Sequence, residues 1–143
     1  MSEIGYGVVG CGRIGTRHVQ VIRQMPGARV VAVSDPDTIR CEDMCRQAPE
    51  AQGYAQLAEV LADPRVDVVV ICSPTHLHAR MTEEACRAGR HVYCEKAMAA
   101  TPNECRAMIM AADKADVKLT IGQCTRFQPA PMMARRLVES GAI

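Results

Sequence analysis

The chain has 143 residues, of which 48% are hydrophobic and 23% charged, and its formal net charge is +1. This length fits one domain, and the near balance of charge argues against a domain that works by binding nucleic acid. The longest apolar stretch, Val68 to Cys72, is far too short for a membrane span, and the N-terminus lacks a signal-peptide pattern. We therefore expect a cytoplasmic globular domain that has neither a nucleic-acid nor a membrane partner.

The eight cysteines do not form a disulfide or metal-binding pattern, because the sequence contains no C-x-x-C. Cys41 and Cys45 stand four residues apart and could share a helix face, but a metal site usually needs four convergent ligands. The H-x-H pair of His76 and His78 would not share a helix face. Reduced cysteine packs as a small hydrophobe, so we expect core packing and no metal site.

Short apolar runs alternate with amphipathic stretches along the chain. Strands are predicted at Ile4–Val9, Val30–Ser34, Val66–Cys72, His91–Cys94 and Lys118–Cys124. Helices are predicted from Ile14 to Met25, at Asp37–Ala48, at Leu57–Leu61, from about His76 to just before Gly89, from Pro102 to Ala112 and from Pro131 to Val138. This order predicts parallel strands joined by helical crossovers, which is an α/β fold with a doubly wound parallel sheet.

A glycine motif lies between the first strand and the first helix. The sequence GCGRIG, which begins at Gly10, matches G-x-G-x-x-G in the context that this motif requires. Gly10 permits the tight turn, Gly12 lets a pyrophosphate approach the backbone, and Gly15 lets the helix pack closely on the strand. Arg13 and Ile14 then lie at the helix N-terminus, whose free N–H groups favour phosphate. The motif predicts a dinucleotide-binding loop.

An acidic residue follows the second strand at the spacing expected for a ribose ligand. Asp35 lies 20 residues after Gly15. Its carboxylate can accept both ribose hydroxyls and would repel a 2′-phosphate, which favours NAD as cofactor over NADP. A nearby arginine, Arg40, could instead hold a 2′-phosphate.

Three further segments should meet at the carboxyl edge of the sheet, where open parallel sheets bind ligands. They are Cys72-Ser73-Pro74-Thr75, Glu95-Lys96, and Gln123 to Arg126. Lys96, if partly buried, could give a substrate hydroxyl a charge-assisted hydrogen bond, with Glu95 orienting or neutralising it. The alternative is that Glu95 and Lys96 form a solvated surface ion pair.

Several segments together resemble the Gfo/Idh/MocA oxidoreductases, named for glucose–fructose oxidoreductase, inositol dehydrogenase and a rhizopine catabolism protein. They are VVGCGRIGTRH, VVAVSDPD, VVVICSPTHLHARM, AGRHVYCEKAMA and RFQP, in this order. The most specific part of the resemblance is the Glu-Lys pair after the fifth strand together with P-T-x-x-H after the fourth. The resemblance implies a Rossmann fold over residues 1–128 and an NAD(P)-dependent dehydrogenase of a sugar, polyol or inositol.

The resemblance also implies roles for individual residues. Lys96, with Glu95 beside it, would contact the substrate and the nicotinamide ribose, and would be the catalytic pair within this chain. Pro74, Thr75 and His78 would line the nicotinamide half of the site. Arg126 would lie near the cofactor.

This sequence departs from the family pattern in two ways. The proline of the family's E-K-P motif is Ala97 here, so the turn after Lys96 is less constrained. Family members also continue into a C-terminal substrate domain, which supplies most of the pocket and usually the oligomer interface. We expect residues 129–143 to be a connecting helix toward that domain, which is absent from this chain. The alternative is a stand-alone NAD-binding regulatory module without turnover; a full-length form would be a homo-oligomer.

Overall fold

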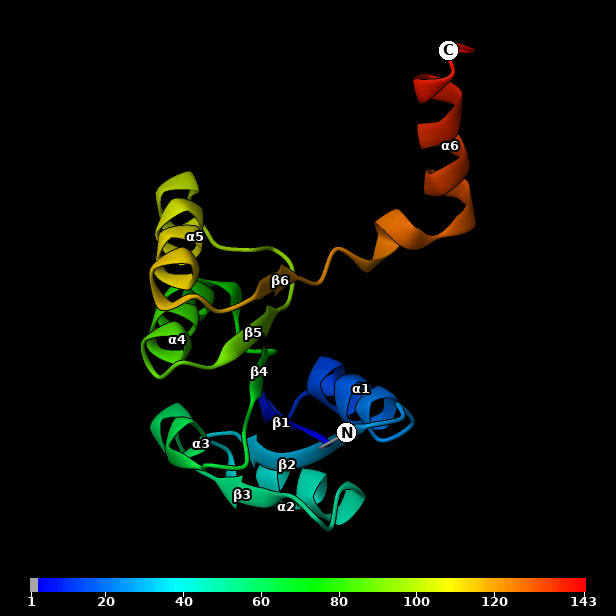
Figure 1. The fold of residues 1–143 in the computed structure, drawn as a ribbon. Helices are drawn as coiled ribbons and strands as arrows, with labels where there is room; N and C mark the ends of the chain where they lie inside the picture. Colours follow the sequence, from blue (N-terminus) through cyan, green and yellow to red (C-terminus); the bar gives the residue numbers. More distant parts are fainter. Residues whose placement is uncertain (1–2) are drawn as a thin grey trace.

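The computed structural model describes residues 3–143 (Figure 1). The strands are β1 (Ile4–Val9), β2 (Ala28–Ser34), β3 (Gln52–Tyr54), β4 (Val68–Ile71), β5 (His91–Cys94) and β6 (Leu119–Ile121). The helices are α1 (Arg13–Ile22), α2 (Thr38–Gln47), α3 (Leu57–Ala62), α4 (Thr75–Arg87), α5 (Pro102–Ala115) and α6 (Pro129–Glu139), with a short 3-10 helix, η1 (Cys124–Phe127), before α6.

The strands form one six-stranded sheet in the order β3-β2-β1-β4-β5-β6. Each neighbouring pair is parallel. From β1 the chain builds the sheet outward through β2 to β3, then crosses back to β4 on the other side of β1 and continues outward through β5 to β6. The switch point therefore lies between β1 and β4, and doubly wound sheets bind ligands at this point. The predicted Rossmann-type α/β fold is confirmed.

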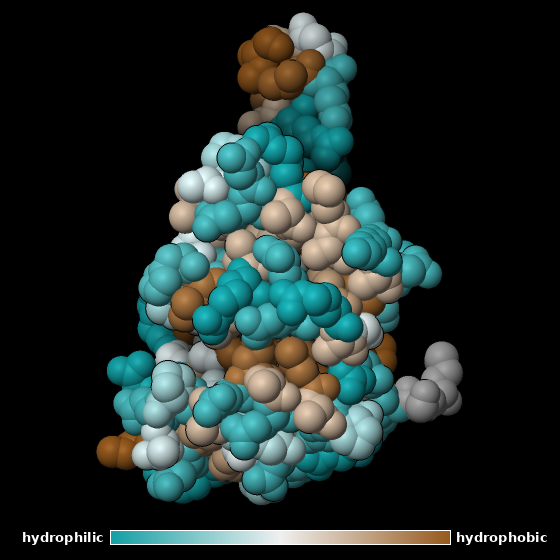
Figure 2. Space-filling model, turned by 90° about the vertical axis from the view of Figure 1, so that its left-hand side faces the viewer, coloured by the Kyte–Doolittle hydropathy of each residue, from teal (hydrophilic) through white to brown (hydrophobic). Residues whose placement is uncertain are grey.

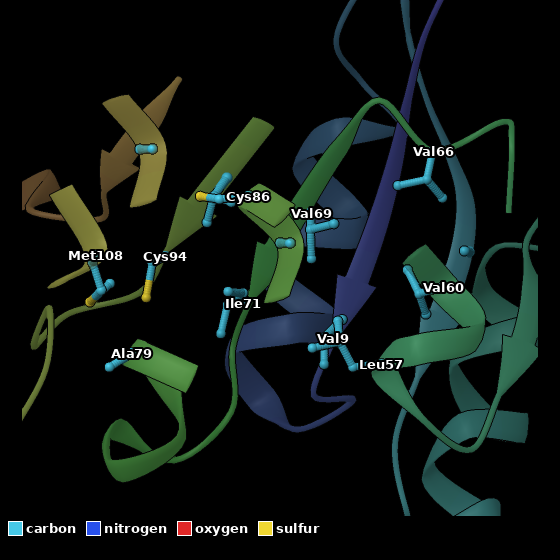
Figure 3. Packing of buried hydrophobic residues seen from close by; sticks show 14 of the residues in the cluster. Val9, Leu57, Val60, Val66, Val69, Ile71, Ala79, Cys86, Cys94 and Met108 are labelled. Atoms are coloured by element: carbon cyan, nitrogen blue, oxygen red, sulfur yellow. The ribbon is translucent and has the colours of Figure 1, made fainter. Parts of the chain in front are cut away.

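Two layers of helices cover the sheet, and each has its own apolar core. Helices α3, α4 and α5 pack on one face through residues such as Leu57, Cys86 and Met108. Figure 3 shows Val69 and Ile71 of β4 in the middle of this cluster, with Met108 and Leu57 on opposite sides of them. Helices α1 and α2 pack on the other face around Val8, Val19, Val30 and Met44. With apolar residues on both faces, β4 reads as a continuous apolar run in the sequence.

Helix α6 stands away from the sheet and its two helical layers (Figure 1). None of its residues is buried, and Met133 and Val138 are more than half exposed at 55% and 62%. Figure 2 shows α6 projecting above the body, and below it an apolar patch framed by hydrophilic side chains. The sheet and its two helical layers thus form a unit without any contribution from α6.

The structure differs from the predicted elements in detail. Strand β3 was not predicted, β4 begins at Val68 rather than Val66, and α6 begins at Pro129 rather than Pro131. Cys124 lies in η1 and is exposed, so its placement in a strand is wrong. All eight cysteines are free thiols, and the predicted core packing is confirmed for Cys41 and Cys86, which are buried. No helix in the described part of the chain is long and apolar enough to cross a membrane.

Candidate functional site

The glycine loop, residues 10–15, joins β1 to α1, and its three glycines have different surroundings. Gly10 has φ +100°, and a Cβ there would lie 2.8 Å from the Cys72 carbonyl group. A Cβ on Gly15 would lie only 1.9 Å from the carbonyl oxygen of Gly10, so no side chain fits between helix and strand. A Cβ on Gly12 would meet no atom within 4 Å. Gly12 therefore presents its backbone to open space at the start of α1.

Asp35 lies at the end of β2 and is only 7% exposed. Its Oδ2 accepts a hydrogen bond from the Cys11 N–H at 2.8 Å, and its Oδ1 accepts one from the Asp37 N–H at 2.9 Å. The carboxylate therefore fixes the glycine loop to the end of the neighbouring strand. Arg40, the alternative phosphate ligand, is exposed and pairs with Asp37 at 3.2 Å.

A cleft of about 790 Å³ opens beside the glycine loop, at the carboxyl ends of β1, β2 and β4. Six of the predicted cofactor residues line it: Gly10, Gly12, Asp35, Cys72, Ser73 and Pro74. The far wall comes from α3 and α4, through residues that include Leu57, Leu77 and Met81. The cleft thus combines a polar end at the loop with an apolar wall, the usual composition of a small-molecule site.

The thiol of Cys72 is held in its protonated form. Burial, helped by the negative charge of Glu95, raises the pKa of Cys72 to about 12. A thiol with this pKa is almost wholly protonated at neutral pH and is a poor nucleophile. Cys72 can therefore contribute surface to the cleft but no covalent chemistry.

Glu95 and Lys96 follow β5, and the structure separates their roles. The Glu95 side chain is 13% exposed and its Oε1 accepts a hydrogen bond from His18 Nε2 at 2.9 Å. Its Oε2 accepts one from the backbone N–H of Lys96 at 3.1 Å. Lys96 itself is exposed. Within residues 3–143 no ion pair joins the Glu95 and Lys96 side chains. The expectation that Lys96 is partly buried is therefore wrong, and so is the alternative that Glu95 and Lys96 form a solvated ion pair.

His78 of α4 lies beneath the surface, only 1% exposed, and is not among the residues that line the cleft. Its Nδ1 is 2.8 Å from the carbonyl oxygen of Ala97, and its Nε2 is 2.9 Å from that of Ser73. The peptide bond between Lys96 and Ala97 is cis. His78 therefore contacts the loop after β4, which lines the cleft, and the turn after β5, but not the cleft itself.

The remaining predicted site residues are not among those that line the cleft. Arg13 and Ile14 are exposed on the first turn of α1, and Thr75 is half-buried at the first position of α4. Arg126 is exposed in η1, on the segment that leads to α6. Arg126 does not line the cleft, so the structure does not bring it together with the glycine loop.

His18 is a residue of this region to which the sequence analysis assigned no role in the site. Its ring packs edge-on against Tyr93, with 5.0 Å between ring centroids. His18 and Glu95 are 77 residues apart, so no local spacing predicts their contact. The available signal was topological: the helix after β1 and the end of β5 both face the carboxyl edge of the sheet. Among the described residues, no three His, Cys, Asp or Glu side chains are grouped so as to hold a metal ion.

The model of the Gfo/Idh/MocA oxidoreductase family, described as an NAD-binding Rossmann fold, matches residues 4–123. The chain belongs to this family. The resemblance seen in the motifs is thereby confirmed, and membership of an oxidoreductase family does not support the alternative of a binding module without turnover.

The chain is similar to dehydrogenases over nearly its whole length. It is 34% identical over 137 residues to myo-inositol 2-dehydrogenase of Thermotoga maritima, covering 96% of this chain and 41% of the relative. It is 36% identical over 140 residues to inositol 2-dehydrogenase 1 of Saccharopolyspora erythraea, covering 96% of this chain and 42% of the relative. The chain therefore spans about two fifths of the length of these relatives.

The solved structures extend this likeness to the backbone. The WlbA dehydrogenase of Bordetella pertussis, in complex with NADH and UDP-GlcNAcA, superposes with a TM-score of 0.93 at 30% identity. The match covers 98% of this chain and 40% of that one. The prediction of a nicotinamide cofactor agrees with the family's NAD-binding fold and with NADH in this structural neighbour.

Proposed function

We propose that this chain is the NAD-binding part of a dehydrogenase that oxidises a hydroxyl carbon of an inositol, sugar or other polyol. The observation that carries the proposal is the cleft beside the glycine loop. Both Gly12, which has open space at the N-terminus of α1, and Asp35, whose carboxylate is fixed by backbone hydrogen bonds, line this cleft. A glycine at a helix N-terminus suits a pyrophosphate, and a carboxylate at the end of the second strand suits an adenosine ribose.

The residues present fit a dinucleotide. The first N–H groups of α1 have no partner inside the helix and would face the phosphates. Asp35 keeps lone pairs free beyond its two backbone hydrogen bonds, since an ionised carboxylate has about four acceptor sites. Pro74 and the apolar residues Leu57, Leu77 and Met81 offer apolar surface to a flat aromatic ring of the dinucleotide. Bound NAD would supply the hydride acceptor of the reaction.

Lys96 is the proposed substrate-contacting residue of this chain. Its side chain is exposed at the end of β5, with no ion pair found for it in the described residues, so its ammonium is available to a ligand. A charge-assisted hydrogen bond from Lys96 would hold the reacting hydroxyl and stabilise the negative charge that its oxygen gains as the hydroxyl proton leaves; transfer of the hydride from carbon to NAD then consumes that charge as the carbonyl forms. The inositol dehydrogenases among the relatives support this class of substrate.

The proposal is tested by titrating the 143-residue chain with NADH while following nicotinamide fluorescence. We expect saturable binding that NAD displaces competitively. Circular dichroism of the same sample establishes that the protein is folded. A folded chain that shows no saturable change with NADH would refute the proposal.

A further inference from the structure

The turn that carries Lys96 is held on both sides by histidines from two different helices. On one side, the Lys96 N–H donates to Glu95 Oε2, and Glu95 Oε1 in turn accepts from His18 Nε2 of α1. On the other side, the carbonyl oxygen of Ala97 lies 2.8 Å from His78 Nδ1 of α4. The lysine side chain is exposed, but the backbone that bears it is anchored.

The Glu95 carboxylate has close neighbours from several elements. A Cβ on Gly122, just beyond β6, would lie 3.0 Å from Glu95 Oε1 and 2.9 Å from the Tyr93 hydroxyl oxygen. A side chain at position 122 would require the Tyr93 hydroxyl and the Glu95 carboxylate to move. The His18 ring is fixed from the side by its edge-on contact with Tyr93. Glu95 is thus confined by α1, β5 and the end of β6, and it has little freedom to reach the Lys96 ammonium instead.

His18 connects two parts of the candidate site that are far apart in sequence. Helix α1 begins at the glycine loop, and His18 lies on its second turn. The Glu95 side chain belongs to the turn that presents Lys96. The contact between them therefore sets the position of the lysine relative to the helix whose N-terminus faces the phosphates.

We propose that His18 is a positioning residue that acts through Glu95 to hold Lys96 toward the nicotinamide ribose. The inference rests on the proposed function, because it takes Lys96 to contact that part of the dinucleotide. What matters in it is the hydrogen bond from Nε2 rather than the volume of the ring. Glutamine can place an amide N–H near the position of Nε2, whereas leucine fills a similar space without a donor.

The first experiment compares binding of NADH and ADP to the wild type, His18→Leu and His18→Gln. ADP lacks the nicotinamide ribose, so the ratio of its dissociation constant to that of NADH isolates the Lys96 end of the site. We expect His18→Leu to lower this ratio about tenfold, as a lost charged hydrogen bond does, while ADP binding is unchanged. His18→Gln should restore most of the ratio. Equal weakening of NADH and ADP by His18→Leu would overturn the proposal, because it would mean a general disturbance of α1.

A double-mutant cycle decides whether His18 acts through the lysine. If it does, His18→Leu combined with Lys96→Met should lower the ratio no further than Lys96→Met alone. If the fold-changes in the ratio that the two single variants cause multiply in the double variant, the proposal is overturned. The matched control is His91→Leu, because His91 begins β5 at the opposite end of the strand, where its Nδ1 accepts from the Lys118 N–H. This variant should leave the ratio unchanged.

A measurement without nucleotide separates failure of this inference from failure of the proposed function. Hydrogen exchange of the Lys96 amide, followed by NMR, reports directly on its bond to Glu95. We expect about tenfold faster exchange in His18→Leu, near-normal exchange in His18→Gln, and no change at the β4 amides in either. Wild-type protein that binds neither nucleotide would refute the proposed function, and this exchange measurement would still decide the role of His18. Unchanged exchange in His18→Leu would overturn that role.

Discussion

Gly12 and Gly15 stand three residues apart in one loop, and the structure gives them opposite tolerance for a side chain. A Cβ on Gly12 meets no atom within 4 Å, so Gly12→Val should leave the fold intact. The valine would occupy the space through which a pyrophosphate approaches the backbone, so NADH binding should fall below detection. Circular dichroism and NADH titration of the same sample test both parts. Gly15→Ala is the contrasting variant: its Cβ would clash with the Gly10 carbonyl oxygen at 1.9 Å, and the protein should lose stability.

Asp35 has two functions at one residue, because it anchors the glycine loop and is the proposed ribose ligand. Asp35→Ser removes the acceptor of the Cys11 N–H, so the free energy of unfolding should fall as well. The informative quantity is therefore the ratio of the NADH and NADPH dissociation constants, which cancels a common loss of fold. Removing a charged ribose contact worth about 1.5–3 kcal/mol, together with its repulsion of a 2′-phosphate, should shift this ratio at least tenfold toward NADPH. An unchanged ratio would contradict the ribose assignment.

At the scale of elements, the sequence predicts the helices and strands that carry a local residue pattern. It misses the strands and side-chain contacts that depend on residues far apart in the chain. The buried run of β4 and the capping box at Thr101 to Glu104 predict their elements because each carries a local pattern. Strand β3, with only Gln52, Gly53 and Tyr54, has no alternating apolar pattern and is held at the sheet edge by pairing with β2. The candidate site divides in the same way. The glycine loop and Asp35 follow a fixed spacing, whereas the His18–Glu95 contact exists only after the sheet has formed.

The connection from α3 to β4 is held by hydrogen bonds to the Asp63 carboxylate, and the stabilisation that they give depends on pH. Asp63 is 5% exposed and accepts hydrogen bonds from the Arg65 guanidinium and the Tyr54 hydroxyl. The Arg65 hydrogen bonds are the main reason that the pKa of Asp63 falls from 3.8 to about 2. Because the folded protein binds this proton less tightly, the stabilisation is complete above about pH 5 and is lost as the pH falls toward 2.

Asp63→Asn should therefore lower the free energy of unfolding by about 2 kcal/mol at pH 7, and by roughly half of that at pH 3. Urea unfolding of the wild type and the variant at pH 7, 5 and 3 measures the difference. Arg80→Gln serves as the control, because Arg80 and Glu84 form an exposed pair on α4, and its effect should be small at every pH. A wild-type advantage that stays constant from pH 7 to pH 3 would show that the carboxylate is not the group responsible.

At the scale of the whole molecule, binding and turnover make different demands on the chain. The proposed NADH binding uses the glycine loop, Asp35 and the apolar wall of α3 and α4, and the six-stranded sheet with its two helical layers supplies all of them. Turnover also needs the reacting carbon to be held about 3–3.5 Å from its acceptor, with water excluded. In the described structure Lys96 is exposed, and Arg126 and α6 stand away from the cleft. If Lys96 marks the nicotinamide end, as we propose, that end of the site lies open to water.

We accordingly expect the 143-residue chain to bind NADH but not to oxidise inositols, hexoses or sugar acids with NAD. Its affinity should also be lower than that of a protein in which the nicotinamide end is covered, since that half of the cofactor gains little from burial here. The measurement is the absorbance of NADH formed with a panel of these compounds, at enzyme concentrations above the measured dissociation constant. Gly12→Val, assayed in parallel, shows what rate arises without cofactor binding. Saturable turnover by the wild type that this variant abolishes would show that residues 3–143 build the substrate pocket by themselves.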